Sequence, residues 1–164
     1  VFNILGPLTN PAGADGQVVG VFDPHLVEPL AKVLAKLGAR HAFVVAGSDG
    51  LDELTLAGVS YIAEARDGTV RTYQVTPEQF GLQRATKAAL MGGEAQENAE
   101  ILRRVLGGEA GPHRDIVLLN AAPAIVAGEG AASMEEGMER AAASIDSGAA
   151  QERLEALVKC SHDS

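Results

Sequence analysis

An apolar strand–helix–strand pattern near the start of the chain constrains its fold more than any other feature. Residues 17–22 (QVVGVF) are typical of a β-strand, and the apolar residues within 26–37 recur at helical spacing. Gly38 is a natural stop for that helix, and the apolar run 42–46 (AFVVA) indicates a second, buried strand. Two strands joined by a crossover helix form a right-handed unit with parallel strands. We therefore predict an α/β fold with a mostly parallel sheet flanked by helices.

The rest of the chain predicts a hairpin followed by helices. Residues 59–64 and 69–75 are strand-like, and the Asp67–Gly68 step between them is a strong hairpin signal. A brief capped turn should follow at 76–79. Beyond Gly93 the predicted helices cover about 95–106, 112–127, 133–147 and 148–159. Pro123 should kink the second of them. With no repeat or linker, residues 1–164 are expected to form a single α/β domain with a helical C-terminal portion.

Charge and composition exclude several classes of partner. The formal net charge of −9 argues against nucleic acid or an anionic membrane, because both are bound mainly by basic surface. A phosphorylated substrate is compatible with it, since a bridging Mg²⁺ reverses the local charge. The single cysteine, Cys160, excludes an intrachain disulfide and favours a cytoplasmic location. No apolar run approaches the ~20 residues that span a bilayer. Position 1 is Val1 rather than Met, so we expect the segment to begin inside a longer chain.

The strongest candidate site follows the second strand, at 47–53 (GSDGLDE). Its two glycines let the backbone turn sharply and approach a ligand. Asp52 and Glu53 come at the carboxyl end of a strand, where open α/β sheets bind ligands. Two carboxylates without a nearby His or Cys suit Mg²⁺, especially Mg²⁺ carried by a substrate phosphate. A plainer interpretation is that the acidic pair begins a helix, where the dipole favours negative charge, and the loop taken alone favours it.

Other polar residues carry weaker signals. Residues 6–13 (GPLTNPAG) predict a rigid, non-helical loop, for which a plain connector is the alternative. The four histidines are scattered without metal-ligand spacing, so each is expected at the surface or at a helix cap. Asn98 and Asn120 fall on predicted helices and are expected to make ordinary capping or packing contacts. No glycine-rich dinucleotide or P-loop motif occurs.

Several of these segments together resemble anthranilate phosphoribosyltransferase. The matching segments are 2–11 (FNILGPLTNP), 44–47 (VVAG), 50–53 (GLDE), 77–82 (PEQFGL), 92–93 (GG) with 97–99 (ENA), and 114–122 (RDIVLLNAA). The first run and the GLDE loop are far more specific together than either alone, and the resemblance is collinear from Val1 to at least Gly148. It implies an incomplete α/β domain of the nucleoside phosphorylase/phosphoribosyltransferase type. The chain would be the C-terminal part of a two-domain family chain, without its N-terminal helical domain.

The resemblance also implies an activity and a set of site residues. Family members transfer the phosphoribosyl group of phosphoribosyl pyrophosphate to the amine of anthranilate, releasing pyrophosphate, in tryptophan biosynthesis. Asp52 and Glu53 match the acidic pair that holds Mg²⁺ on the pyrophosphate. Gly6 and Pro7 match a Gly-Pro step beside the route of anthranilate, and with Asn3 they are the expected substrate-binding residues. No acid–base catalyst is implied, and the family forms homodimers through its helical domain.

The chain also departs from the family pattern. The glycine-rich loop that cradles pyrophosphate, a basic segment and an anthranilate-contacting arginine are absent, and Ala46 stands where the family usually has His. We therefore expect these residues alone to be inactive. Two alternatives stay open: a pyrimidine nucleoside phosphorylase-like enzyme, and a nucleic-acid-binding relative that has given up the reaction. The presence of both segments 2–11 (FNILGPLTNP) and 50–53 (GLDE) disfavours a nucleoside phosphorylase. The net charge of −9 disfavours a nucleic-acid-binding protein.

Overall fold

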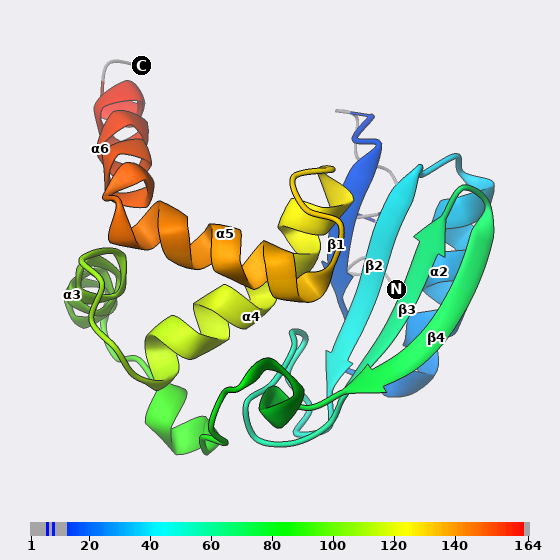
Figure 1. Cartoon of the computed structure of the whole chain (residues 1–164), viewed down its shortest axis with the longest axis horizontal. Coiled ribbons are helices and arrows are strands. Elements are labelled where there is room, and N and C mark those ends of the chain that lie inside the picture. Colours follow the sequence, from blue (N-terminus) through cyan, green and yellow to red (C-terminus); the bar gives the residue numbers. More distant parts are fainter. Residues whose placement is uncertain (1–5, 7, 9–12, 163–164) are drawn as a thin grey trace.

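The strand–helix–strand unit predicted from the sequence forms one side of a four-stranded sheet (Figure 1). The computed structural model describes Gly6, Leu8 and residues 13–162. The strands lie in sequence order: β1 (Gly16–Gly20), β2 (His41–Gly47), β3 (Ser60–Arg66) and β4 (Thr69–Val75). A 3-10 turn, η1 (Pro24–Leu26), and helix α2 (Val27–Lys36) connect β1 to β2, which pair in parallel. The α/β class and the parallel crossover unit are confirmed.

Strands β3 and β4 join this unit antiparallel, so the described sheet is mixed rather than mostly parallel. The chain returns from β2 to β3 through a loop without a crossover helix, and such a return places the next strand antiparallel. Asp67 and Gly68 then connect β3 directly to β4 with φ angles of 49° and 78°. Positive φ at both positions is the geometry of a tight hairpin turn, which confirms the predicted hairpin.

Both faces of the sheet are covered at β2, which is buried along its whole length. Helix α2 covers one face, where Ala42, Val44 and Ala46 join the core. Helix α4 (Pro112–Ala127) covers the other face, where Phe43 and Val45 lie in one core cluster with its buried side chains. Because β1 and β2 are parallel, their carboxyl ends lie at the same edge of the sheet, and the loop after β2 begins there.

The helical part of the chain follows the sequence prediction closely. Its elements are η2 (Pro77–Phe80), η3 (Lys87–Leu90), α3 (Ala95–Leu106), α4, α5 (Met134–Asp146) and α6 (Ala149–His162). The expected cap of α5 is present, since the Ser133 hydroxyl accepts a hydrogen bond from the Glu136 N–H at 3.3 Å. Helix α4 continues through Pro123, which is buried. In the described part of the chain, no helix has the length and apolar character needed to cross a membrane.

Candidate functional site

The loop between β2 and β3 carries the predicted metal ligands, and with the strand residue at each of its ends (residues 47–60) it is called the acidic loop here. Asp52 and Glu53 are both exposed, and the interpretation of this pair as a helix start is wrong because no helix follows it. Partial burial of the carboxyl group, and then the neighbouring charge of Asp52, raise the pKa of Glu53 above its ordinary value. Two carboxylates therefore share one small region of the surface.

A third acidic residue, Asp49, organises the acidic loop from within. Its Oδ2 accepts a hydrogen bond from the Thr55 hydroxyl at 2.9 Å, and its Oδ1 accepts one from the Leu51 N–H at 3.3 Å. The Thr55 N–H in turn donates to the Ser60 hydroxyl at 2.9 Å. Both oxygens of Asp49 therefore hold the loop together, whereas Asp52 and its neighbour are exposed.

Asn120 ties the acidic loop to helix α4. Its Oδ1 accepts a hydrogen bond from the Leu54 N–H at 2.8 Å, and its Nδ2 donates to the Leu54 carbonyl at 2.9 Å. The same Nδ2 lies 3.1 Å from the carbonyl oxygen of Ile116, one helical turn earlier. The expectation of an ordinary packing or capping contact therefore missed a long-range bridge. Nothing local in the sequence pairs position 120 with position 54.

The other predicted site residues are only partly described. Asn3 and Pro7 lie outside the described residues. Gly6 is exposed, and a Cβ added to it would meet no described atom within 4 Å. Gly6 and Leu8 both have helical backbone, which corrects the prediction of a non-helical loop at these two positions.

A buried polar cluster on the sheet was also missed. Glu64 on β3 is 4% exposed, and its carboxylate accepts hydrogen bonds from Arg71 at 2.6 and 2.9 Å and from the Tyr73 hydroxyl at 3.2 Å. Its other oxygen lies 2.8 Å from Nε2 of His41, which is 3% exposed rather than at the surface as expected. Burial alone would raise the pKa of Glu64, but the hydrogen bonds from Arg71 and His41 outweigh it and lower that pKa.

Part of this cluster follows from the hairpin. A two-residue turn at Asp67–Gly68 places Glu64 opposite Arg71 on one face of the sheet, as the register shows. That pair could be read from the sequence once the turn is recognised. The approach of His41 could not, because it depends on how β2 meets β3.

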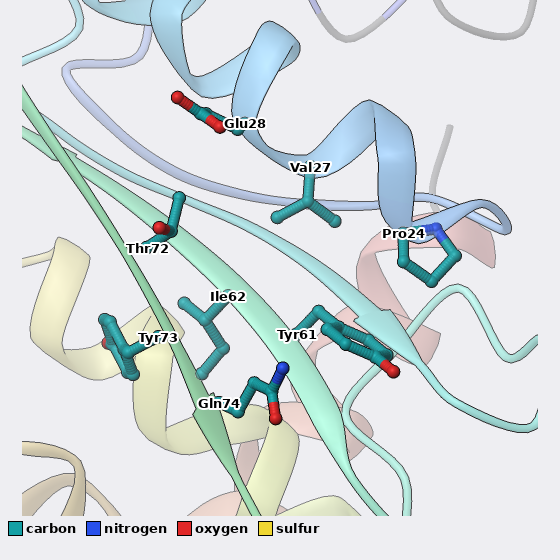
Figure 2. Close-up of a pocket in the computed structure, with 8 residues that line it drawn as sticks. All are labelled: Pro24, Val27, Glu28, Tyr61, Ile62, Thr72, Tyr73 and Gln74. Carbon is teal, nitrogen blue, oxygen red and sulfur yellow. The ribbon is translucent and has the colours of Figure 1, made fainter.

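A separate cavity lies on the α2 side of the sheet. It measures about 510 Å³, and Figure 2 shows its lining residues coming from η1, the start of α2, β3 and β4. Its single carboxylate, Glu28, forms an ion pair with Lys32 at 2.6 Å. Neither member of the acidic pair lines this cavity, so the cavity is separate from the predicted metal ligands.

The acidic loop fits Mg²⁺ by the chemistry of its donors. Asp52 and Glu53 offer hard carboxylate oxygens at the surface, which is the ligand type that Mg²⁺ prefers. Two carboxylates occupy only part of an octahedral shell, and the remaining positions suit phosphate oxygens and water. No group of three or more His, Cys, Asp or Glu able to hold a metal is found among the described residues. The donor set therefore matches a metal that is shared with a substrate.

Comparison with known proteins finds relatives that match nearly the whole chain. Residues 1–151 match the model of the glycosyl transferase family, a/b domain. The chain is 52% identical over 162 residues to the anthranilate phosphoribosyltransferase of Symbiobacterium thermophilum, covering 99% of this chain and 48% of that one. The crystal structure of the Thermus thermophilus enzyme superposes with a TM-score of 0.87 at 45% identity, covering 96% of this chain and 46% of that one.

A solved structure of a more distant relative carries ligands. The anthranilate phosphoribosyltransferase of Saccharomyces cerevisiae in complex with PRPP and Mg superposes with a TM-score of 0.80 at 31% identity. The superposition covers 94% of this chain and 45% of the Saccharomyces cerevisiae chain. The chain thus spans about half the length of the relatives it matches. The comparisons give no support to the nucleoside phosphorylase or nucleic-acid-binding alternatives.

Proposed function

The chain belongs to the glycosyl transferase family, and we propose that it is the metal-binding half of an anthranilate phosphoribosyltransferase. Its substrates would be phosphoribosyl pyrophosphate and anthranilate, and its product phosphoribosyl-anthranilate, in the tryptophan pathway. The observation that carries the proposal is the exposed Asp52–Glu53 pair, held in an ordered loop at the carboxyl end of β2. The match of the whole chain to relatives of that name supports it.

The proposed reaction is a substitution at the anomeric carbon of the ribose. The anthranilate amine forms a new C–N bond there, while the C–O bond to pyrophosphate breaks and pyrophosphate leaves with the electron pair. The nitrogen then loses one proton to solvent, so no oxidant or reductant is needed. Negative charge accumulates on the leaving group, and stabilising that charge is the main task of the site.

Asp52 and Glu53 would hold Mg²⁺ at this leaving group. When bound, Mg²⁺ neutralises charge on the pyrophosphate oxygens and makes the pyrophosphate a better leaving group. The two carboxylates contribute by fixing where that neutralising charge lies. No histidine, lysine or arginine occurs within 47–60, and its exposed carboxylates are assigned to the metal, so we assign no acid–base catalyst to this loop. Positioning of the substrates would account for the rest of the rate.

Asn3, Gly6 and Pro7 are proposed to line the route of anthranilate. A segment with few accessible backbone conformations suits a slot for a flat aromatic ring. In a complete enzyme, Pro7→Gly should raise the KM for anthranilate more than the KM for phosphoribosyl pyrophosphate. An equal change in both constants would identify the segment as a connector.

The remaining parts of the proposal concern the whole enzyme. A complete family chain would add the pyrophosphate cradle and the helical domain through which it forms a homodimer. A cytoplasmic location fits a biosynthetic enzyme with a single cysteine. Nucleic acid and membranes are not expected as partners, because the net charge of −9 would repel both.

The test is a chimaera that joins these 164 residues to the remaining half of the Thermus thermophilus relative. With Mg²⁺ and phosphoribosyl pyrophosphate, the chimaera should consume anthranilate. The loss of anthranilate fluorescence measures this consumption. A parallel reaction with thymidine and phosphate should release no thymine. Thymidine cleavage without anthranilate consumption would overturn the proposal in favour of a nucleoside phosphorylase.

A further inference from the structure

We propose that Asn120 is a positioning residue, which fixes the metal-binding carboxylates of the acidic loop from helix α4. The proposal rests on the proposed function, because it assumes that Asp52 and Glu53 hold the metal. Leu54 is the residue directly after this pair, and the Asn120 carboxamide engages both its N–H and its carbonyl, at 2.8 and 2.9 Å. One side chain thus makes the paired hydrogen bonds that a neighbouring strand would make in a sheet.

The acidic pair is held from both ends. On the earlier side, the Gly47 N–H donates to the carbonyl of Leu51 at 2.8 Å, which closes the turn before Asp52. On the later side, Asn120 holds Leu54, the first of three buried residues that return the chain to the core. Only Asp52 and Glu53 lie between these two anchored residues. Hydrogen bonds of the residues on either side therefore hold the backbone of the pair.

The Asn120 carboxamide is itself oriented. Its Nδ2 also lies 3.1 Å from the carbonyl oxygen of Ile116 on the preceding turn of α4. On the same face of this helix, Pro123 lies about one turn later and is fully buried, and Ile116 lies one turn earlier and packs against the core, so this surface of α4 is otherwise apolar. A polar side chain there is tolerated because its hydrogen bonds are satisfied. Packing alone would be met by an apolar residue, whereas holding a backbone segment requires an amide.

Hydrogen exchange tests the anchor directly. In Asn120→Leu, the amide of Leu54 loses its acceptor and should exchange at least about tenfold faster, while the amides of β2 stay protected. Asn98→Leu is the matched control. The Asn98 amide makes the same pair of hydrogen bonds, with Gly93 N–H and carbonyl at 2.9 and 2.8 Å, on exposed α3 apart from the acidic loop (Figure 1). That variant should leave Leu54 exchange unchanged.

Binding of Mn²⁺ alone tests the consequence for the site. Paramagnetic broadening of the Asp52 and Glu53 amide signals reports binding without any turnover. Asn120→Leu should lower Mn²⁺ affinity about tenfold, as is usual when a residue that orients metal ligands is lost. Asn98→Leu should leave the affinity at the wild-type value, and Asp52→Asn with Glu53→Gln should remove the broadening.

The outcomes separate the two proposals. Unchanged Leu54 exchange in Asn120→Leu overturns the anchor. Wild-type Mn²⁺ affinity in Asn120→Leu, together with loss of broadening in the double carboxylate variant, overturns the positioning role and leaves the metal role of the acidic pair intact. Wild-type broadening in the double carboxylate variant overturns the metal role itself, whatever Leu54 does.

Discussion

Gly20, the last residue of β1, lies directly against the backbone carbonyl of Asp52 in the acidic loop. A Cβ built on Gly20 would overlap that carbonyl oxygen, so no side chain fits between the strand and the loop. The loop that carries the acidic pair is therefore seated on the end of β1 as well as bonded to α4. Close backbone approach is a reason for glycine that does not depend on a positive φ.

The first prediction concerns this contact. Gly20→Ala should destabilise the fold by about 1–3 kcal/mol, because the methyl group forces the backbone of Asp52 to move. Mn²⁺ affinity should fall as well, since the acidic pair moves with it. Gly128→Ala is the control: a Cβ there would lie 3.4 Å from the Ala124 carbonyl oxygen, an ordinary contact. Chemical denaturation of both variants measures the difference, and equal midpoints would contradict the overlap.

The second prediction concerns the acidic pair in catalysis. Asp52→Asn with Glu53→Gln, placed in the chimaera, should lower kcat at saturating Mg²⁺ by about 100-fold or more, because charge on the leaving group is no longer offset. The circular dichroism spectrum should stay unchanged, since both side chains are exposed. Turnover within a factor of about two of the parent enzyme would rule out a metal-binding role, because a lost charge clamp is expected to cost several kcal/mol.

The third prediction concerns acid stability and Glu64. Because its folded-state pKa is lowered below 4.5, the ionised carboxylate stabilises the fold above that pH. This contribution is lost as the pH falls through the lower, folded-state pKa. Glu64→Gln should therefore reduce stability at neutral pH, by about 1–2 kcal/mol given the exposure of Arg71, and flatten the acid limb of the stability curve.

The groups that face Glu64 in this prediction are His41, Arg71 and Tyr73. Urea denaturation from pH 3 to 7 follows the difference between variant and parent. The exposed Glu100→Gln serves as the control and should leave the acid limb in place. If the unfolding free energy of Glu64→Gln falls as much between pH 7 and pH 3 as that of the parent, other carboxylates govern the loss of stability in acid.

The fourth prediction is that the 164-residue chain by itself gives no product. Phosphoribosyl pyrophosphate needs basic groups or backbone amides to offset its charge. The acidic loop contains no lysine or arginine, and its two exposed carboxylates repel pyrophosphate that carries no metal. Calorimetric titration with Mg²⁺ and phosphoribosyl pyrophosphate should detect no micromolar binding. Micromolar binding accompanied by phosphoribosyl-anthranilate would mean that this half carries an anion cradle of its own.

Short-range patterns determined much of this protein. Helical spacing, the Gly107–Gly108 stop and the Pro112 start set α3 and α4 at their observed bounds. Asp67–Gly68 set the hairpin and with it the pairing of Glu64 with Arg71. The GLDE segment located the exposed acidic pair. Each of these depends on residues within a few positions of one another, where backbone preference and side-chain period decide the outcome.

The tertiary structure alone decided how the acidic pair is held. Asn120 and Leu54 are 66 positions apart, and the burial of His41 against Glu64 requires β2 and β3 to meet in one register. The contact of Gly20 with Asp52 likewise joins the ends of separate elements. No periodicity encodes such contacts, because they arise only when packing brings distant segments together and buried polar groups must find partners. The sequence identified the carboxylates, and packing around them set their position.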